Sequence, residues 1–525
     1  MTASLSRRER RLDAASAAAG VAWMELPGPE LDDSSRSLLE RGIGGVVLFG
    51  ANIRGVDQLR RLTAELRAVA VGPLRIAIDH EGGHVTRIGA PVTRFPSAMA
   101  IGATGSEELA HAVARAAGEE LASLGIDVNL APVMDLAADP RNPSVGARSF
   151  GSSPGLVARL GAAMVRGYRA AGIAPTAKHF PGHGRTAVDS HLAVATVEGG
   201  IEALRGADLP PFRAAIAAGV DLVMASHVVY EGLTDGLPAT ISPPILRDLL
   251  RGELGFEGLL LTDAMVMRAL ADRRPIAAAC VEALAAGADV VMPMRDHQAE
   301  AVDGLEAAIG SGELAESRVL EALGRAARLD EHLRALRRPP AKGVVLPDST
   351  HAELARTVAR RSLTLLRGAE LLPVDPSSSV AVVELASRRP SPVEEEGAHS
   401  ATLGAALAGY LPRMRAVVVG GPDDAAGRRA AAEAAAAAEL VILATRDAWL
   451  WPEDSELVAA IAASERPTVL VALRNPYDLV QLARTAGAIA AYADVPATLE
   501  ALAEALTGRI GWPGRLPMHL PERLA

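Results

Sequence analysis

Eight short apolar segments rich in β-branched residues alternate with helix-like segments over the first two thirds of the chain, and this alternation restricts the possible folds most strongly. Residues 55–70 and 106–125 are typical helix-like segments, with Ala, Leu, Glu and Arg at helical spacing. Eight strand–helix repeats are typical of a closed parallel barrel, and a doubly wound open sheet is the alternative. The number of repeats and the length of the region favour closure. The segments are VAWMEL at Val21, GVVLF at Gly45, LRIAID at Leu74, IDVNLAP at Ile126, IAPTAKHF at Ile173, DLVMASH at Asp221, GLLLTD at Gly258 and DVVMP at Asp289.

Polar residues stand at the carboxyl ends of five of these segments. In a barrel these ends converge on the one face where active sites are built. A single polar residue in this position is most simply a strand end that faces solvent, but five together predict a functional site. They are Asp79, Lys178 with His179, His227, Asp263, and Arg295 with Asp296.

A second domain follows the barrel. The segment RRPPAKGVVLP after Leu336 holds three prolines and no periodicity, which indicates a linker. We therefore expect an α/β protein: a TIM-like (β/α)8 barrel over residues 1–336, a linker over 337–348 and an α/β sandwich over 349–525. No catalytic motif stands out in the second domain, because GGPDDAAG lacks the G-x-G-x-x-G spacing. Its five strand-like segments are SVAVVEL, RAVVVGG, ELVILAT, TVLVAL and GAIAAY.

Composition excludes several classes of protein. With 49% hydrophobic and 22% charged residues, and 49 Gly and 34 Pro, the chain is neither disordered, collagenous nor a coiled coil. A net charge of −10 disfavours a nucleic-acid partner. No stretch reaches 18 uninterrupted apolar residues, so we expect no membrane span. The single cysteine, Cys280, cannot form an internal disulfide, which favours the cytoplasm. The oligomeric state stays open.

The segment KHFPGHGRTAVDSH, residues 178–191, carries the densest group of reactive side chains. Its prolines and glycines predict a loop rather than a helix. A metal site is one alternative, disfavoured because Lys178 would repel a cation; its ligands would be His179, His183, Asp189 and His191. A structural role for the histidines is a second alternative. A nucleophilic Ser190 is a third, although no nucleophile elbow surrounds it.

The fourth alternative for this loop is a catalytic dyad. Asp189 and His191 are two positions apart, so their side chains can meet if the loop curls. The carboxylate would then fix the imidazole tautomer and make the ring a proton donor and acceptor near neutral pH.

Asp263 is the second catalytic candidate, because it ends an apolar strand segment at the expected barrel mouth. It can stay ionised if donors such as Lys178 hold it. Opposite a proton donor it could attack an anomeric carbon and form a covalent glycosyl intermediate. A helix N-cap is the simpler alternative for an Asp in this position.

Five motifs in order give a more specific indication. They run from about Val21 to Leu329 and resemble family three of the glycoside hydrolases, more narrowly its bacterial β-N-acetylglucosaminidase branch. The sandwich resembles the second domain of the two-domain members. The motifs are IAIDHEGGHVTRI, NLAPVMDLAADPRNPSVGARSFG, AKHFPGHGRTAVDSH, VMASHVVYEGLTDGLPATIS and LGFEGLLLTDAMVMRAL.

The resemblance implies roles for individual residues. It makes Asp263 the nucleophile and His191, oriented by Asp189, the general acid and base. It also implies that a terminal sugar is held through its hydroxyls, and that the reaction needs neither a metal nor an organic cofactor. The sugar-holding residues would be Asp79, Arg148, Lys178 and His179.

Three residues depart from the family pattern. Family members read D-Q-E-G-G-R and G-H-G-D-T where this chain has His80, His84 and Arg185, which leaves the identity of the sugar and its aglycone open. We predict a retaining exo-β-N-acetylglucosaminidase with a small carbohydrate substrate, either cell-wall muropeptides or chitin oligosaccharides. The alternatives are a phosphorylase or β-glucosidase on the same fold and, from another class, a carbohydrate sensor without turnover.

Overall fold

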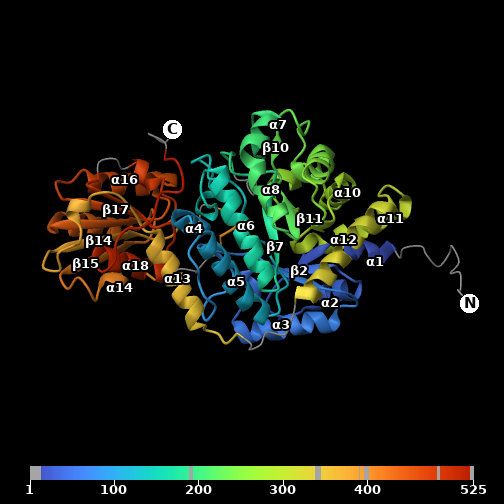
Figure 1. The fold of residues 1–525 in the computed structure, drawn as a ribbon, viewed down its shortest axis with the longest axis horizontal. Coiled ribbons are helices and arrows are strands. Elements are labelled where there is room, and N and C mark those ends of the chain that lie inside the picture. Colours follow the sequence, from blue (N-terminus) through green and yellow to red (C-terminus); the bar gives the residue numbers. More distant parts are fainter. Residues whose placement is uncertain are drawn as a thin grey trace, which may run out of the picture.

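The computed structural model describes residues 14–188, 193–336, 344–389, 391–394, 401–481 and 485–520. Two lobes lie side by side (Figure 1). The larger lobe, blue to yellow-green, contains the first two thirds of the chain, and the smaller lobe, orange to red, contains the last third. No helix among the described residues is long and apolar enough to cross a membrane.

The larger lobe is a parallel barrel, as predicted, and each of the eight predicted segments contains one strand. The strands pair in chain order. The ring closes where Ala22 bridges Val291, whose N–H donates to the Val21 carbonyl oxygen at 3.0 Å. The strands are β1 (Trp23–Glu25), β2 (Gly45–Leu48), β3 (Arg75–Ile78), β6 (Val128–Asn129), β7 (Ala174–Phe180), β9 (Leu222–Ala225), β11 (Leu259–Ala264) and β12 (Val290–Met292).

The strand pleat sorts side chains between the barrel interior and the outer layer. In β2, Val47 points into the barrel, whereas Val46 and Leu48 pack outward against the helices. Trp23 fills the interior, and a Cβ on the adjacent Gly45 would stand 2.7 Å from its ring. The barrel is therefore a packed core, and its open space lies at the strand ends.

Helices surround the barrel (Figure 1). Several begin at side-chain caps: Ser97 Oγ accepts from the Ala100 N–H and Ser106 Oγ from the Leu109 N–H, both at 3.2 Å. The helices are α1 (Ala14–Gly20), α2 (Asp33–Glu40), α3 (Val56–Val69), α4 (Ala98–Thr104), α5 (Glu107–Ser123), α6 (Pro154–Ala170), α7 (Gly200–Ala203), α8 (Leu209–Ala217), α9 (Arg268–Ala271), α10 (Ile276–Ala286), α11 (Gln298–Ser311) and α12 (Glu316–Leu336). Two small sheets join β4 (His80–Gly82) to β5 (Val85–Thr86) and β8 (Thr196–Val197) to β10 (Val229–Tyr230).

The smaller lobe is a three-layer α/β sandwich, as predicted. Its sheet has the order β13-β18-β17-β16-β14-β15. All five predicted strands are present; the sequence did not predict β13 (Thr364–Arg367), a short antiparallel edge strand. The other strands are β14 (Val380–Leu385), β15 (Met414–Val419), β16 (Leu440–Thr445), β17 (Thr468–Ala472) and β18 (Gly487–Ala490). The helices are α13 (Ser349–Ser362), α14 (Leu403–Leu407), α15 (Ala425–Ala437), α16 (Pro452–Ala462), α17 (Asp478–Gln481) and α18 (Pro496–Leu506).

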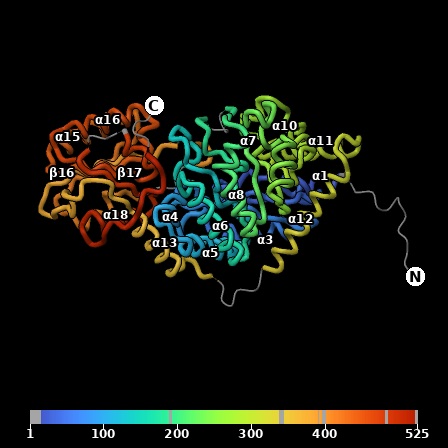
Figure 2. The backbone as a smooth tube through the Cα atoms, turned by 45° about the horizontal axis from the view of Figure 1, so that its top comes forward, coloured from blue at the N-terminus to red at the C-terminus, as the bar shows by residue number. Residues whose placement is uncertain are grey.

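The two faces of this sheet pack differently. Ala381 and Val383 of β14 face α15 and α16, whereas Val380 and Val382 face α14 and α18. The first face continues into the barrel lobe, because Met99 of α4 belongs to the same hydrophobic cluster. Figure 2 shows α4 and α13 together at the junction of the lobes. Most of the predicted linker, 337–348, lies outside the described residues, and the domain bounds stay a prediction.

A cluster of charged side chains of the smaller lobe lies next to the barrel lobe. Arg474 contacts Glu394 at 2.9 Å and Asp494 at 3.2 Å, and Arg446 contacts Asp494 at 2.9 Å. Glu394 lies 3.9 Å from His84 Nε2 of the barrel lobe. The ion pairs thus lie within the smaller lobe, and Glu394 carries this cluster to within 3.9 Å of the barrel lobe.

The first prediction concerns a buried aspartate, Asp289, that directly precedes β12 at the amino-terminal end of the strand. The Asp289 carboxylate is fully buried and contacts Arg251 at 2.6 Å, Arg325 at 3.0 Å and also Arg318. Asp289→Asn leaves these arginines without their carboxylate, so we expect a loss of about 3 kcal/mol in the free energy of unfolding, measured by chemical denaturation. The control Asp303→Asn, at an exposed partner of Arg41, should cost less than about 1 kcal/mol. Equal losses in the two variants would contradict the prediction.

The second prediction concerns pH. Burial raises the pKa of Glu394 from its ordinary 4.5 to about 7, with Arg474 opposing the shift and Asp447 and Asp494 adding to it. The folded state therefore holds this proton at pH values where the unfolded state has released it, so the wild type loses stability as pH rises from about 5 to about 8. Glu394→Gln removes this contribution. We expect the Tm of the variant, relative to wild type, to increase over that range; a constant difference would contradict the assignment.

Candidate active site

A cavity of about 540 Å³ opens at the carboxyl ends of the barrel strands. Its lining follows from the pleat, because residues two positions beyond an inward-facing core residue also face inward. Asp79 follows Ala77 of β3 in this way, and Asp263 follows Leu261 of β11. Lys178 of β7 and the strand-end residues Glu25 and Phe49 line the cavity as well.

Lys178 lies at the centre of a buried ionic network. Its Nζ contacts Asp79 Oδ1 at 2.5 Å and Glu81 Oε1 at 2.7 Å. Burial disfavours the ammonium form, but these two carboxylates outweigh burial and raise the pKa of Lys178. The lysine therefore stays charged and holds Asp79 at the cavity.

Arg148 completes this network from a different loop. It donates to both Glu81 oxygens at 2.8 Å in a bidentate pair. Against the effect of burial, Arg148 and Lys178 lower the pKa of Glu81, and Glu81 raises the pKa of Arg148. Glu81, Lys178 and Arg148 are thus ionised. Three of the four predicted sugar-holding residues, Asp79, Arg148 and Lys178, lie in this network.

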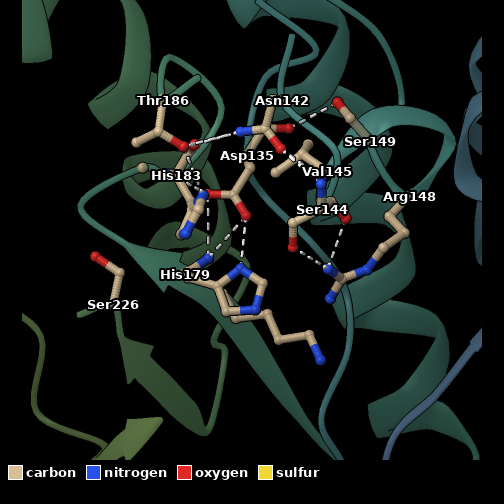
Figure 3. Close-up of polar contacts among 12 residues, drawn as sticks. Asp135, Asn142, Ser144, Val145, Arg148, Ser149, His179, His183, Thr186 and Ser226 are labelled. Atoms are coloured by element: carbon tan, nitrogen blue, oxygen red, sulfur yellow. Dashed lines mark hydrogen bonds and ion pairs between the residues drawn. The ribbon is translucent and has the colours of Figure 1, made fainter. Parts of the chain in front are cut away.

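His179, the fourth predicted sugar-holding residue, is fixed by Asp135 (Figure 3). Its Nδ1 lies 2.7 Å from Asp135 Oδ2, and the same carboxylate accepts the backbone N–H of His183 at 2.6 Å. Asn142 donates to the His183 carbonyl oxygen and to Thr186 Oγ1, both at 3.0 Å. These contacts hold the start of the histidine-rich loop against the loop that carries Arg148.

Asp263 lies half-buried at the cavity, and Oδ1 accepts the Ala264 N–H at 2.8 Å. The N-cap alternative is wrong for this residue, because the next helix, α9, has Met267 as its N-cap. The prediction for His227 is also wrong. This ring is fully buried behind the cavity wall, with Nε2 at 3.0 Å from the Ala264 carbonyl oxygen and Nδ1 at 2.7 Å from Thr240 Oγ1.

The predicted dyad, Asp189 and His191, lies outside the described residues, so its roles stay predictions. Two of the four residues of the metal alternative fall in the same gap. Among the residues on either side of that gap and elsewhere in the described chain, no group of three or more His, Cys, Asp and Glu could hold a metal ion.

The three departures from the family pattern lie away from the cavity lining. His80 is buried and the His84 side chain is only 8% exposed; burial lowers their pKa values to about 4 and about 3, so both rings are neutral. Arg185 contacts Asp208 at 2.8 Å and donates to the Glu198 carbonyl oxygen at 3.1 Å. Arg185 thereby links the segment before residues 189–192 to segments that follow them.

Several residues that line the cavity were not predicted from the sequence. Arg87 is buried, and its Nη2 lies 3.6 Å from Asp79 Oδ2. Burial raises the pKa of Glu25, while the backbone N–H and charge of Arg295 oppose the shift. Glu25 lies two positions beyond Trp23, and Phe49 lies two positions beyond Val47, so both continue the inward-facing positions of their strands. Four methionines also line the cavity: Met224, Met267, Met292 and Met294.

Comparisons with known proteins agree with this geometry. The sequence profile of the glycosyl hydrolase family 3 N-terminal domain matches residues 21–329. The structure of a glycoside hydrolase family 3 β-N-acetylglucosaminidase from Paenibacillus sp. str. FPU-7 superimposes with a TM-score of 0.93 at 36% identity, covering 98% of this chain and 100% of that one.

Two curated relatives are similar in sequence. The β-hexosaminidase A of Pseudoalteromonas piscicida is 34% identical over 395 residues, which cover 69% of this chain and 64% of that protein. This chain thus matches less than two thirds of that relative's length. The β-hexosaminidase of Stenotrophomonas maltophilia strain K279a is 37% identical over 336 residues, covering 58% of this chain and 98% of that protein.

The resemblance inferred from the five motifs is therefore confirmed. The profile match covers more than half of the chain and includes the whole ionic network around Lys178. The chain belongs to glycosyl hydrolase family 3 and is a glycoside hydrolase.

Proposed function

We propose that the chain is a retaining exo-β-N-acetylglucosaminidase that removes terminal N-acetylglucosamine from cell-wall muropeptides or chitin oligosaccharides in the cytoplasm. The observation that carries the proposal is the position of Asp263, which shares one cavity with Asp79, Lys178 and Arg148. The functions of similar proteins support the choice of sugar: the Paenibacillus structure is of a β-N-acetylglucosaminidase, and the curated relatives are β-hexosaminidases.

The ionic network gives the sugar its hydroxyl-binding surface. Asp79 accepts hydrogen bonds, and Lys178, Arg148 and His179 can donate them, so hydroxyls meet both kinds of partner. Because each of these side chains is fixed by a neighbour, little conformational entropy is lost when the sugar binds. The sugar is held with its anomeric carbon toward Asp263.

The reaction is a double displacement. The Asp263 carboxylate attacks the anomeric carbon, while His191 protonates the departing glycosidic oxygen. His191, oriented by Asp189, then takes a proton from water, and the resulting hydroxide equivalent releases the sugar from the aspartyl ester. No metal or organic cofactor takes part in these steps.

The third prediction tests the nucleophile. Asp263→Asn keeps the size of the side chain and removes its charge, so we expect the release of nitrophenol from a β-N-acetylglucosaminide to fall at least about 1,000-fold. Asp303→Asn, on α11, should keep wild-type activity. If Asp263→Asn retained more than a tenth of the wild-type rate, Asp263 could not be the nucleophile.

The same assay separates the alternatives. Faster cleavage of the glucoside than of the N-acetylated sugar would indicate a β-glucosidase, and sugar 1-phosphate formed in phosphate buffer would indicate a phosphorylase. Binding of sugar without turnover would indicate a sensor.

The fourth prediction tests the ionic network. Glu81→Gln removes the carboxylate that Lys178 and Arg148 share, so this contact no longer fixes the positions of the two cationic side chains at the cavity. We expect kcat/KM to fall at least about tenfold, the equivalent of one charge-assisted hydrogen bond. Glu65→Gln, at an exposed partner of Arg36, is the matched control. An unchanged kcat/KM in Glu81→Gln would show that the network does not position the sugar.

A further inference from the structure

One side of the cavity is not made by the barrel. Pro392 and Val393, which belong to the smaller lobe, line it together with the strand-end residues. These two residues lie between Ser391 and Glu394, both buried. Both lobes therefore line the cavity, and two of its lining residues, Arg87 and Val393, are 306 positions apart in the chain.

The Val393 backbone contacts a charged group of the site. Its carbonyl oxygen accepts from Arg87 Nη1 at 2.8 Å. The other terminal nitrogen of Arg87 lies 3.6 Å from Asp79 Oδ2, and the guanidinium lies 5.8 Å from the centre of the Phe49 ring. A backbone atom of the smaller lobe thus orients an arginine that stands beside Asp79.

Buried ion pairs hold the 391–394 segment in place. Glu394 Oε2 accepts from Arg474 Nη1 at 2.9 Å, and Arg474 Nη2 donates to Ser387 Oγ at 2.7 Å. The Glu394 N–H donates to the Ser391 carbonyl oxygen at 3.2 Å, which closes a turn. The position of Val393 therefore depends on the carboxylate of Glu394.

We propose that the 391–394 segment of the smaller lobe is a specificity-determining wall of the sugar pocket, in which Pro392 and Val393 bound the sugar and the Val393 carbonyl positions Arg87. The proposal rests on the proposed function for the identity of the sugar. Glu394 is a positioning residue, because it acts on the pocket through Val393.

Two substitutions of Val393 test the wall, because they change the side chain and keep the backbone carbonyl. Val393→Ala widens the pocket, and we expect KM for nitrophenyl β-N-acetylglucosaminide and Ki for free N-acetylglucosamine to rise together about tenfold, with little change in kcat. Val393→Phe fills the pocket, and both constants should rise at least about tenfold.

A second pair of variants tests the contact of Glu394 with Arg474 that holds the 391–394 segment. Glu394→Ala removes the acceptor of Arg474, so KM should rise while kcat changes little. Glu394→Gln keeps an acceptor oxygen and should retain a KM near that of wild type. Arg428→Gln is the control, because it breaks an ion pair of the smaller lobe, with Asp454 at 2.8 Å, that does not involve the 391–394 segment.

Each outcome decides the proposal. Values of KM and Ki within about twofold of wild type in both Val393 variants would contradict the proposal that Val393 bounds the sugar. Even one methylene in a hydrophobic pocket typically changes binding tenfold or more. An equal loss in Glu394→Ala and Arg428→Gln would reduce Glu394 to a purely structural role. If the wild type cleaves another glycoside instead, the proposed function fails, and the same variants assayed on that glycoside test the wall. If calorimetry detects no sugar binding to the wild type, both proposals fail.

Discussion

The contact of Lys178 with two carboxylates is the interaction on which the site depends. A buried ammonium is costly unless it is paired, and Asp79 and Glu81 supply the pairing at 2.5 and 2.7 Å. Glu81 in turn holds Arg148, so charged side chains from three separate segments of the chain hold one another in place. These contacts explain how a barrel interior of apolar side chains can end in a charged surface that offers hydrogen bonds to a sugar.

The sequence predicted the elements of the fold well, because apolar segments rich in β-branched residues mark buried strands. For three of the predicted strand-end residues, the parity of the pleat explains the outcome. Lys178 and Asp263 continue the inward-facing positions of β7 and β11 and reach the cavity. His227 has the opposite parity: Leu222 and Met224 of β9 face inward, so His227 points behind the wall. Counting positions along each strand from its last inward-facing residue would have distinguished Lys178 and Asp263, which reach the cavity, from His227, which does not.

Other features of the site could not be predicted, because they depend on contacts distant in the chain. Arg87 belongs to the site through Asp79 and through a carbonyl oxygen 306 positions later. The departures at His84 and Arg185 raised doubt about the sugar when only their place in the motifs was known. In the structure His84 faces Glu394 and Arg185 faces Asp208, so both belong to the support of the site rather than to its lining.

The most direct test of the account is to trap the covalent intermediate with a fluorinated N-acetylglucosaminyl substrate and to map the labelled peptide by mass spectrometry. We expect one label on the peptide that contains Asp263, with retention of the anomeric configuration in the released product. A label on any other carboxylate, or an inverted product without a covalent adduct, would contradict the central claim.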